Sequence, residues 1–219
     1  FNGSSTTNNY VVSGLTVSTT YSITISAKDA SNNESTQSTA VNATTTDGAA
    51  LANELFFSEY VEGGNYRKAI EIANLTGTVV DLSIYSVKRQ SKGSWESPLV
   101  LSGYSIGVDD VFVITNSSTE NEILIEQSDL GIPNQTPMTF NGDDRIGLFK
   151  NDVLIDIIGD LNGTSDFAKD ITLRRKLSVT SPNTTYTISE WDILPKDTVD
   201  GIGVYNSATA SINANEFEN

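Results

Sequence analysis

The chain has 219 residues, of which 28 are acidic and 13 are basic, so its formal net charge is −15, and it contains neither cysteine nor histidine. So acidic a chain offers few cations to neutralise phosphates, and we expect no nucleic-acid binding. No apolar run approaches the roughly 20 residues that cross a bilayer, so we expect no membrane insertion. The missing thiol and imidazole exclude Ser-His-Asp and Cys-His catalysis and ordinary zinc sites, but leave carboxylate-pair glycosidase chemistry and oxygen-ligated calcium open.

The first 47 residues alternate polar side chains with apolar or β-branched ones, a pattern typical of strands exposed on one face. The alternation predicts strands at 10–12, 21–27 and 40–46, with a polar, Asn-rich turn at 31–34. Three strands cannot close a sandwich, so we expect this first domain to be incomplete within the chain.

The segment from Leu15 to Tyr21 reads LTVSTTY and resembles the L-x-P-x-T-x-Y turn of fibronectin type III repeats. Val17 stands where those repeats usually have proline. The resemblance implies that residues 1–47 correspond to strands E to G of such a repeat and that Tyr21 forms its tyrosine corner. It also implies that strands A to C precede Phe1 in the full protein.

A linker is predicted at 48–53, where small and polar residues follow one another without periodicity. Beyond it, short apolar or β-branched runs alternate with Gly, Asn, Asp or Pro, which indicates a β-sandwich at 54–205. The predicted strands are 55–60, 69–74, 79–88, 99–101, 111–115, 122–126, 138–140, 145–149, 153–158, 171–175 and 185–188. Residues 206–219 are small, polar and acidic, and we expect a tail or a linker to a C-terminal sorting domain.

Several short motifs in the second domain occur in the order found in bacterial lamin-tail domains. They are Ser58-Glu59 with Gly63-Gly64, the strand 69–74, Val80 to Ser83, the Asn141 to Asp144 turn, Ile155-Asp156, Thr172 to Arg175 and Glu190-Trp191. The series resembles that family, which implies an immunoglobulin-like β-sandwich without activity of its own, attached to secreted nucleases, phosphatases or surface proteins. The predicted fold is therefore all-β, with two immunoglobulin-like β-sandwich domains, the first incomplete.

Two acidic loops could supply oxygen ligands to calcium. The candidates are Asp143 and Asp144 in one loop, and Asp160, Asn162, Asp166 and Asp170 in the other. The alternative for the first loop is a turn in which Asn141-Gly142 takes positive φ and the Asp side chains cap backbone amides. The second loop places its glycine wrongly for an EF-hand and lacks flanking helices, so the sequence favours structural turns over metal sites in both.

The candidates for an acid–base pair of the glycosidase type are Glu59, Glu62, Glu71 and Asp81. Glu71 lies between Ile70 and Ile72 in a predicted strand, so its side chain is predicted to face solvent. A hydrated sheet face explains these carboxylates better than catalysis does. We therefore predict no enzyme activity, no catalytic residue and no cofactor.

The two tryptophans differ in their surroundings. Trp191, within a motif of the lamin-tail series, is predicted to lie in the core. Trp95 lies in the polar segment 91–97, where an indole either packs over an end of the sandwich or stacks on a sugar. Both readings stay open, and Trp95 is the candidate ligand residue.

Arg174, Arg175 and Lys176 form the one basic cluster of the sequence. On a strand their side chains alternate between the two faces, so we predict that they pair with carboxylates and do not form a phosphate site. The triplet Asp197-Thr198-Val199 resembles bacterial extracytoplasmic O-glycosylation sites, which makes Thr198 a candidate for modification.

These observations predict a non-catalytic accessory, adhesion or targeting module of a secreted or cell-surface bacterial protein. The acidic residues 216–219 resemble the stretch ahead of a type IX secretion sorting domain. The expected partners are neighbouring domains of the same polypeptide, the secretion machinery, and a cell-surface protein or glycan. The alternatives are a carbohydrate-binding module acting through Trp95 and the accessory region of a secreted nuclease whose catalytic domain lies outside this chain.

Overall fold

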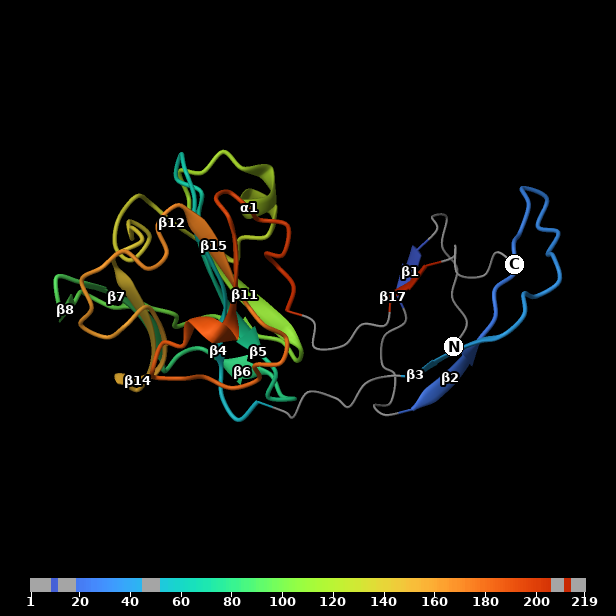
Figure 1. Ribbon diagram of the computed structural model, residues 1–219, viewed down its shortest axis with the longest axis horizontal. Coiled ribbons are helices and arrows are strands. Elements are labelled where there is room, and N and C mark those ends of the chain that lie inside the picture. Colours follow the sequence, from blue (N-terminus) through green and yellow to red (C-terminus); the bar gives the residue numbers. More distant parts are fainter. Residues whose placement is uncertain (1–8, 12–18, 45–51, 206–210, 214–219) are drawn as a thin grey trace. The chain divides into compact units, whose positions relative to one another are not determined.

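A computed structural model describes residues 9–11, 19–44, 52–205 and 211–213 of the chain (Figure 1). The chain divides into two compact units, one formed by Phe1–Ala49 with Asn206–Asn219 and the other by Ala50–Tyr205. The described residues are nearly all β-structure, with one α-helix and one short 3-10 helix among them. The all-β prediction is confirmed.

The described residues of the first unit include four short strands. They are β1 (Asn9–Val11), β2 (Thr20–Ile23), β3 (Val41–Thr44) and β17 (Ser211–Asn213). β2 pairs antiparallel with β3, and β1 pairs antiparallel with β17. Tyr21 lies in β2, whereas Leu15 and Val17 lie outside the described residues, as does most of 48–53. β17 falls within 206–219, the segment read from the sequence as a tail or linker.

The second unit contains two main sheets. The six-stranded sheet has the order β12 (Leu130–Ile132), β11 (Asp110–Asn116), β5 (Lys68–Asn74), β4 (Phe56–Glu62), β15 (Ile171–Arg175) and β16 (Trp191–Pro195), antiparallel except for β11–β12. The five-stranded sheet contains β14 (Val153–Ile158), β13 (Arg145–Lys150), β7 (Tyr85–Ser91) and β8 (Ser94–Trp95), with β9 (Leu99–Val100) also paired to β7. A small third pair joins β6 (Val80–Asp81) to β10 (Ser105–Ile106).

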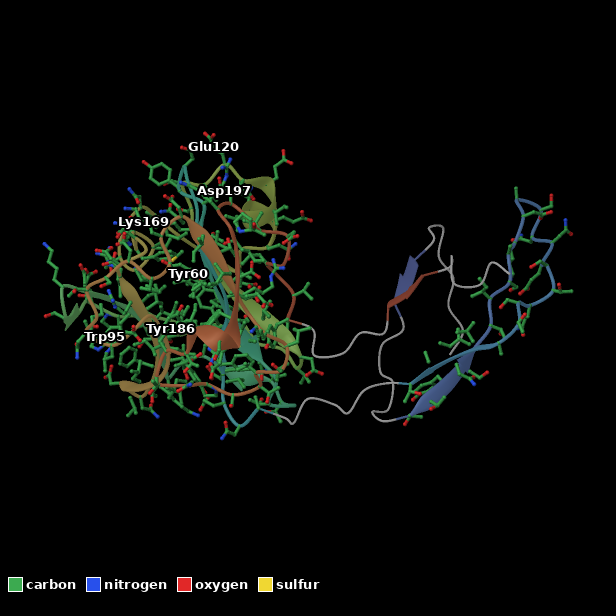
Figure 2. The ribbon with its side chains drawn as sticks, in the orientation of Figure 1. Tyr60, Trp95, Glu120, Lys169, Tyr186 and Asp197 are labelled. Carbon is green, nitrogen blue, oxygen red and sulfur yellow. The ribbon has the colours of Figure 1, made fainter. Side chains whose placement is uncertain are left out.

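The main core lies between these two sheets. Alternate residues of each strand point inward, so β5 contributes Ile70 and Ile72 and β13 contributes Ile146 and Leu148, all fully buried. Tyr60 belongs to the same cluster, and Figure 2 shows it in the interior of the unit. Burying one such side chain contributes about 1.5–3 kcal/mol, and this shared core makes the unit a sandwich.

A second apolar cluster covers the opposite face of the six-stranded sheet. Alternating residues of β4, β5 and β11 contribute to it, including Val61, Ala69, Ala73, Val111 and Val113. Leu124 of the helix α1 (Glu122–Glu126) and three residues of the segment 199–205 pack onto this face. The six-stranded sheet is therefore buried on both faces, unlike the one-sided sheet that strict polar–apolar alternation would predict.

Several predicted strands are wrong. Residues 122–126 form α1, because the side chain of Asn121 accepts a hydrogen bond from the Leu124 amide at 3.0 Å and caps a helical turn. Residues 138–140 form a turn that buries Met138 and Phe140. Residues 185–187 have no regular structure, and Ile188 begins a 3-10 helix (Ile188–Glu190) that leads into β16. The predicted strand 79–88 is two strands, β6 and β7. Short apolar runs do not by themselves distinguish these elements.

Candidate functional site

A buried ion network ties the two sheets together. Arg175, whose side chain is 1% exposed, donates through Nη1 to Asp156 Oδ2 at 3.1 Å and through Nη2 to Glu190 Oε2 at 2.6 Å. Its guanidinium carbon lies 4.8 Å from the ring centroid of Trp191, which is buried as predicted. Burial raises the pKa of Asp156, and the Arg175 charge opposes that rise. Arg175 is therefore a structural cation, not one available to a phosphate.

Asp156 also organises backbone. Its Oδ2 accepts a hydrogen bond from the Phe57 amide at 2.7 Å, and its Oδ1 accepts one from the Asn183 amide at 2.9 Å. The carboxylate thus connects β14 of one sheet to β4 of the other and to the loop before β16. Because both carboxylate oxygens of Asp156 already accept hydrogen bonds from the protein, they are not free to take a proton from a substrate. Asp156 is therefore a structural residue.

A second buried polar cluster lies on the opposite face of the six-stranded sheet. Glu59 and Glu71 are directly opposite each other on β4 and β5, and both are 1% exposed. Glu59 Oε2 accepts a hydrogen bond from Arg174 Nε at 2.7 Å. Glu71 accepts hydrogen bonds from Ser58 Oγ and from the Gly203 amide, each at 2.7 Å.

The prediction that Glu71 faces solvent is wrong. Strand alternation does turn Glu71 away from the main core, but the segment 199–205 and α1 cover that side. Burial raises the pKa of Glu71 to about 7, assisted by the negative charge of Glu59 and opposed by the two hydrogen-bond donors and by Arg174. Asp81, by contrast, is exposed and accepts a hydrogen bond from the Ser83 amide at 2.8 Å.

The predicted pairing with carboxylates is confirmed for Arg174 and Arg175 but not for Lys176. Arg174 faces Glu59 and Asp200 on one side of β15, whereas Arg175 points into the sandwich toward Asp156. Lys176 donates to the Ser189 carbonyl at 2.9 Å. The cluster divides between two faces and makes no common anion site.

The calcium candidates divide between an acidic cleft and structural contacts. A cleft of about 400 Å³ is lined by Glu62, Asn141, Gly142, Asp143, Asp166, Lys169 and Asp170. Asp166 faces Lys169 at 3.6 Å, and Asp170 is paired with Lys196. Across the described ranges no three acidic side chains are placed to hold one metal ion.

The remaining calcium candidates hold loops in place. Asp144 Oδ2 accepts hydrogen bonds from the Asn141 amide at 2.9 Å and from Arg89 Nη1 at 3.2 Å. Neither Asn141 nor Gly142 has a positive φ, although the Asp144 amide closes a turn onto the Asn141 carbonyl. Asn162 bonds to Gln90 through its side chain at 3.0 Å, and the Asp160 carbonyl accepts from Arg145 at 2.8 Å.

Trp95 lies on the outward face of the five-stranded sheet. Its ring centroid is 5.0 Å from that of Phe149 in an edge-to-face arrangement, and the residue is half-buried. Its ring packs over Gly147, where a Cβ atom would approach it to 2.7 Å. Lys88 lies over the Phe149 ring, with its Nζ 4.3 Å from the ring centroid and 3.0 Å from an Asp152 oxygen. Figure 2 places Trp95 at the margin of the unit, far from Tyr60.

Thr198 is half-exposed at a turn. Its hydroxyl donates to the Pro195 carbonyl at 2.8 Å, and its own carbonyl accepts from Thr172 Oγ1 at 2.8 Å. The preceding Asp197 has φ +64° and accepts a hydrogen bond from the Gly64 amide at 2.9 Å. These bonds anchor the start of the segment that covers Glu71.

The family assignment follows from a match over residues 48–161, more than half of the 219 residues, to the Lamin Tail Domain family. The chain belongs to the lamin tail domain family. This match and the two-sheet core confirm the predicted immunoglobulin-like β-sandwich of the lamin tail domain. The match ends before β15 and β16, which belong to the same compact unit. Comparisons with curated proteins and with solved structures gave no match.

The buried cluster of Ser58, Glu71 and Gly203 in the lamin tail domain was missed by the sequence reasoning. Its signal is a glutamate flanked by Ala69 and Ala73 on the same face of β5, since small apolar neighbours indicate a covered face. No helix in the part of the chain that the structure describes is long and apolar enough to cross a membrane.

Proposed function

We propose that this lamin tail domain is a non-catalytic accessory module that serves adhesion or targeting in a secreted or cell-surface bacterial protein. The observation that supports this proposal is the state of the buried carboxylates. Glu59 and Asp156 each hold an arginine, Glu62 holds Lys68 at 2.6 Å, and Glu71 holds a hydroxyl and a backbone amide. General acid–base chemistry needs carboxyl groups that reach a substrate, whereas Glu59, Glu71 and Asp156 face protein and Glu62, which lines the acidic cleft, is held by Lys68.

The finer assignment includes the flanking segments. We propose that residues 1–47 belong to a fibronectin type III repeat and that 206–219 precede a sorting domain of type IX secretion cargo. Thr198 is the proposed O-glycosylation site, and its half-exposed position at a turn is compatible with access by a transferase. Secretion machinery and neighbouring domains are the corresponding partners.

The test is deletion of residues 52–205 from the full polypeptide in the organism that produces it. We expect the secreted protein to keep any activity that its other domains possess while its retention on the cell surface falls. Equal retention of the deleted and intact proteins would refute the adhesion or targeting role. Recovery of the intact protein only from the cytosol would refute the proposed localisation.

A second candidate function is carbohydrate binding at Trp95. A half-buried indole with a charged pair, Lys88 and Asp152, beside it provides an apolar platform with a polar rim. The test compares glycan binding by the chain with that of Trp95→Ala, with Tyr66→Ala as control, since Tyr66 is an exposed aromatic on another strand connection. Equal binding by Trp95→Ala and the intact chain removes this candidate.

The third reading is an accessory region of a secreted nuclease. It places the catalytic domain elsewhere in the polypeptide, so the 219-residue chain alone should hydrolyse neither DNA nor RNA, with or without calcium. Hydrolysis by the purified chain would contradict both this reading and the non-catalytic proposal.

A further inference from the structure

The segment 199–205, here named the closing segment, covers the outer face of the six-stranded sheet. Val199, Ile202 and Tyr205 insert into the second apolar cluster, and the Tyr205 ring lies 5.4 Å from that of Phe56. The Tyr205 hydroxyl, with its single proton, lies between two acceptors just after β15, 2.8 Å from the Lys176 carbonyl oxygen and 2.7 Å from that of Val179. The closing segment therefore separates the Glu59–Glu71 pair from solvent.

Negative charge dominates beneath the closing segment. Glu71 is faced by Glu59 from β4, by Arg174 from β15 and by Tyr205 from the closing segment itself. Asp200 of the closing segment pairs with Arg174, and its negative charge acts on Glu59. Within the described part of the chain, Arg174 is the one cation that acts on Glu71, and it is shared between Glu59 and Asp200. Two ionised glutamates at directly opposite positions of neighbouring strands repel each other.

Further carboxylates lie on the α1 side of the same segment. Asp110 and Asp129 line a small cavity of about 190 Å³ together with Gly203, the residue whose amide bonds to Glu71. Burial raises the pKa of Asp129, and the charge of Asp110 adds to that rise. Glu126 also lines this cavity, and among the described residues no lysine or arginine does. The closing segment therefore lies in a region of excess negative charge on both sides.

We propose that the closing segment is a proton-dependent latch, held closed by a proton on Glu71 and loosened when that proton is lost. The geometry accommodates the proton without loss of contacts. A protonated Glu71 donates through Oε1 to Ser58 Oγ, which can accept as well as donate, while Oε2 still accepts from the Gly203 amide. Deprotonation leaves two facing carboxylates with one shared arginine.

The direction of the effect follows from linkage. The pKa of Glu71 is about 7 when the segment is closed, against an ordinary value of 4.5 for a solvated glutamate. Between these two pH values the closed form binds one more proton than the open form. The equilibrium constant for opening therefore rises about tenfold with each pH unit. From pH 5 to pH 8 the equilibrium constant for opening should rise by about 100-fold in total, since the rise levels off above pH 7.

Hydrogen exchange detected by mass spectrometry tests the proposal on the whole chain. Exchange of the amides in 199–205 is measured between pH 5 and pH 8 and divided by the intrinsic rate of unstructured peptides at each pH. We expect protection of these amides to fall by about 100-fold, while the amides of β5 and β11, which exchange only through fuller unfolding, stay better protected than the closing segment at every pH. Unchanged protection in the closing segment across this range would overturn the latch.

Two variants separate Glu71 from the other carboxylates. Glu71→Gln keeps an acceptor for Gly203 and cannot ionise, so protection should become independent of pH. The control is Glu120→Gln, an exposed glutamate that Figure 2 shows at the periphery of the unit, which should retain the pH dependence. A Glu71→Gln protein that keeps the pH dependence would overturn the assignment.

A further variant covers the case in which Glu71→Gln fails to fold. Glu59→Gln removes the neighbouring charge and leaves Glu71 ionisable. The pH at which protection levels off should then move downward, because the charge of Glu59 contributes to the raised pKa of Glu71. An unchanged midpoint would show that the two carboxylates do not act on each other and would overturn the proposed mechanism.

Discussion

Replacement of Arg175 by methionine tests the buried ion network. Methionine has a similar length and no charge, so Asp156 and Glu190 lose their cation while the packing beside Trp191 is largely kept. Removing one partner of a buried pair typically costs about 3–5 kcal/mol, because the other charge remains buried. Asp156 keeps its backbone donors from Phe57 and Asn183, so we expect the lower end, about 3 kcal/mol.

The companion variants are Asp156→Asn and the double variant Arg175→Met with Asp156→Asn. The double variant should recover part of the loss, because no unpaired charge stays in the interior, and the coupling free energy should exceed about 1 kcal/mol. Urea unfolding followed by tryptophan fluorescence measures it, since Trp191 lies 4.8 Å from the Arg175 guanidinium. With slopes of about 1–3 kcal/mol/M, the Arg175→Met midpoint should fall by about 1–3 M.

The reasoning would be refuted by either of two results. One is an Arg175→Met protein within about 0.5 kcal/mol of the wild type, as is usual for surface substitutions. The other is additivity of the two single changes, which would show that Arg175 and Asp156 contribute independently despite their 3.1 Å contact.

Three further predictions follow from other contacts. Gly147→Ala should destabilise the second unit by about 1–3 kcal/mol and change Trp95 fluorescence, because the new methyl would lie 2.7 Å from the Trp95 ring; unchanged stability and emission would contradict the packing. Asn121→Ala should cost about 1 kcal/mol in a thermal melt by removing the cap of α1, with no loss expected for Asn121→Asp. Because the folded pKa of Glu71 exceeds 4.5, its stabilisation is complete below pH 4.5 and lost as the pH rises through about 7; the free energy of unfolding should fall by about 3 kcal/mol over this range relative to Glu71→Gln, and parallel pH curves of the two proteins would disprove it.

The sequence predicted the strands of the sandwich well wherever a long apolar run was bounded by turn residues. The strands 69–74, 145–149, 153–158 and 171–175 correspond to β5, β13, β14 and β15 within a residue or so at each end. These strands are long enough for periodicity to be clear, and glycine, asparagine or aspartate marks most of their ends. Fold class depends mainly on such elements, and it was predicted correctly.

Short apolar runs were less informative. The run 122–126 has three consecutive aliphatic residues between two glutamates, as a short buried strand could have, yet it forms α1. The decisive residue is Asn121, whose carboxamide caps the helix, while Ile123 and Ile125 remain exposed. A five-residue run contains too little periodicity to outweigh a cap, so the signal lay in the preceding residue.

The candidate sites depended on tertiary contacts that no local pattern contains. Trp191 was placed in the core correctly, whereas Glu71 was not, because its burial depends on a segment more than a hundred residues later in the chain. The calcium candidates were adjacent in sequence, but Asp144 bonds to Arg89 in another strand and is thereby drawn out of the acidic cleft. Sequence proximity of carboxylates therefore says little about which of them converge.

A β-bulge explains why the polar cluster exists at all. Strict alternation along β4 would put Phe57 and Glu59 on the same face, but the register shifts between them, so Ser58 and Glu59 both lie opposite Glu71. The shift lets Phe57 and Tyr60 both enter the main core although they are three residues apart. One inserted residue thus satisfies the apolar core and places two carboxylates under the closing segment. The bulge therefore links the packing of the sandwich to the proposed latch. Without it, β4 would lose both the packing of Phe57 and Tyr60 in the main core and the pair of carboxylates under the closing segment.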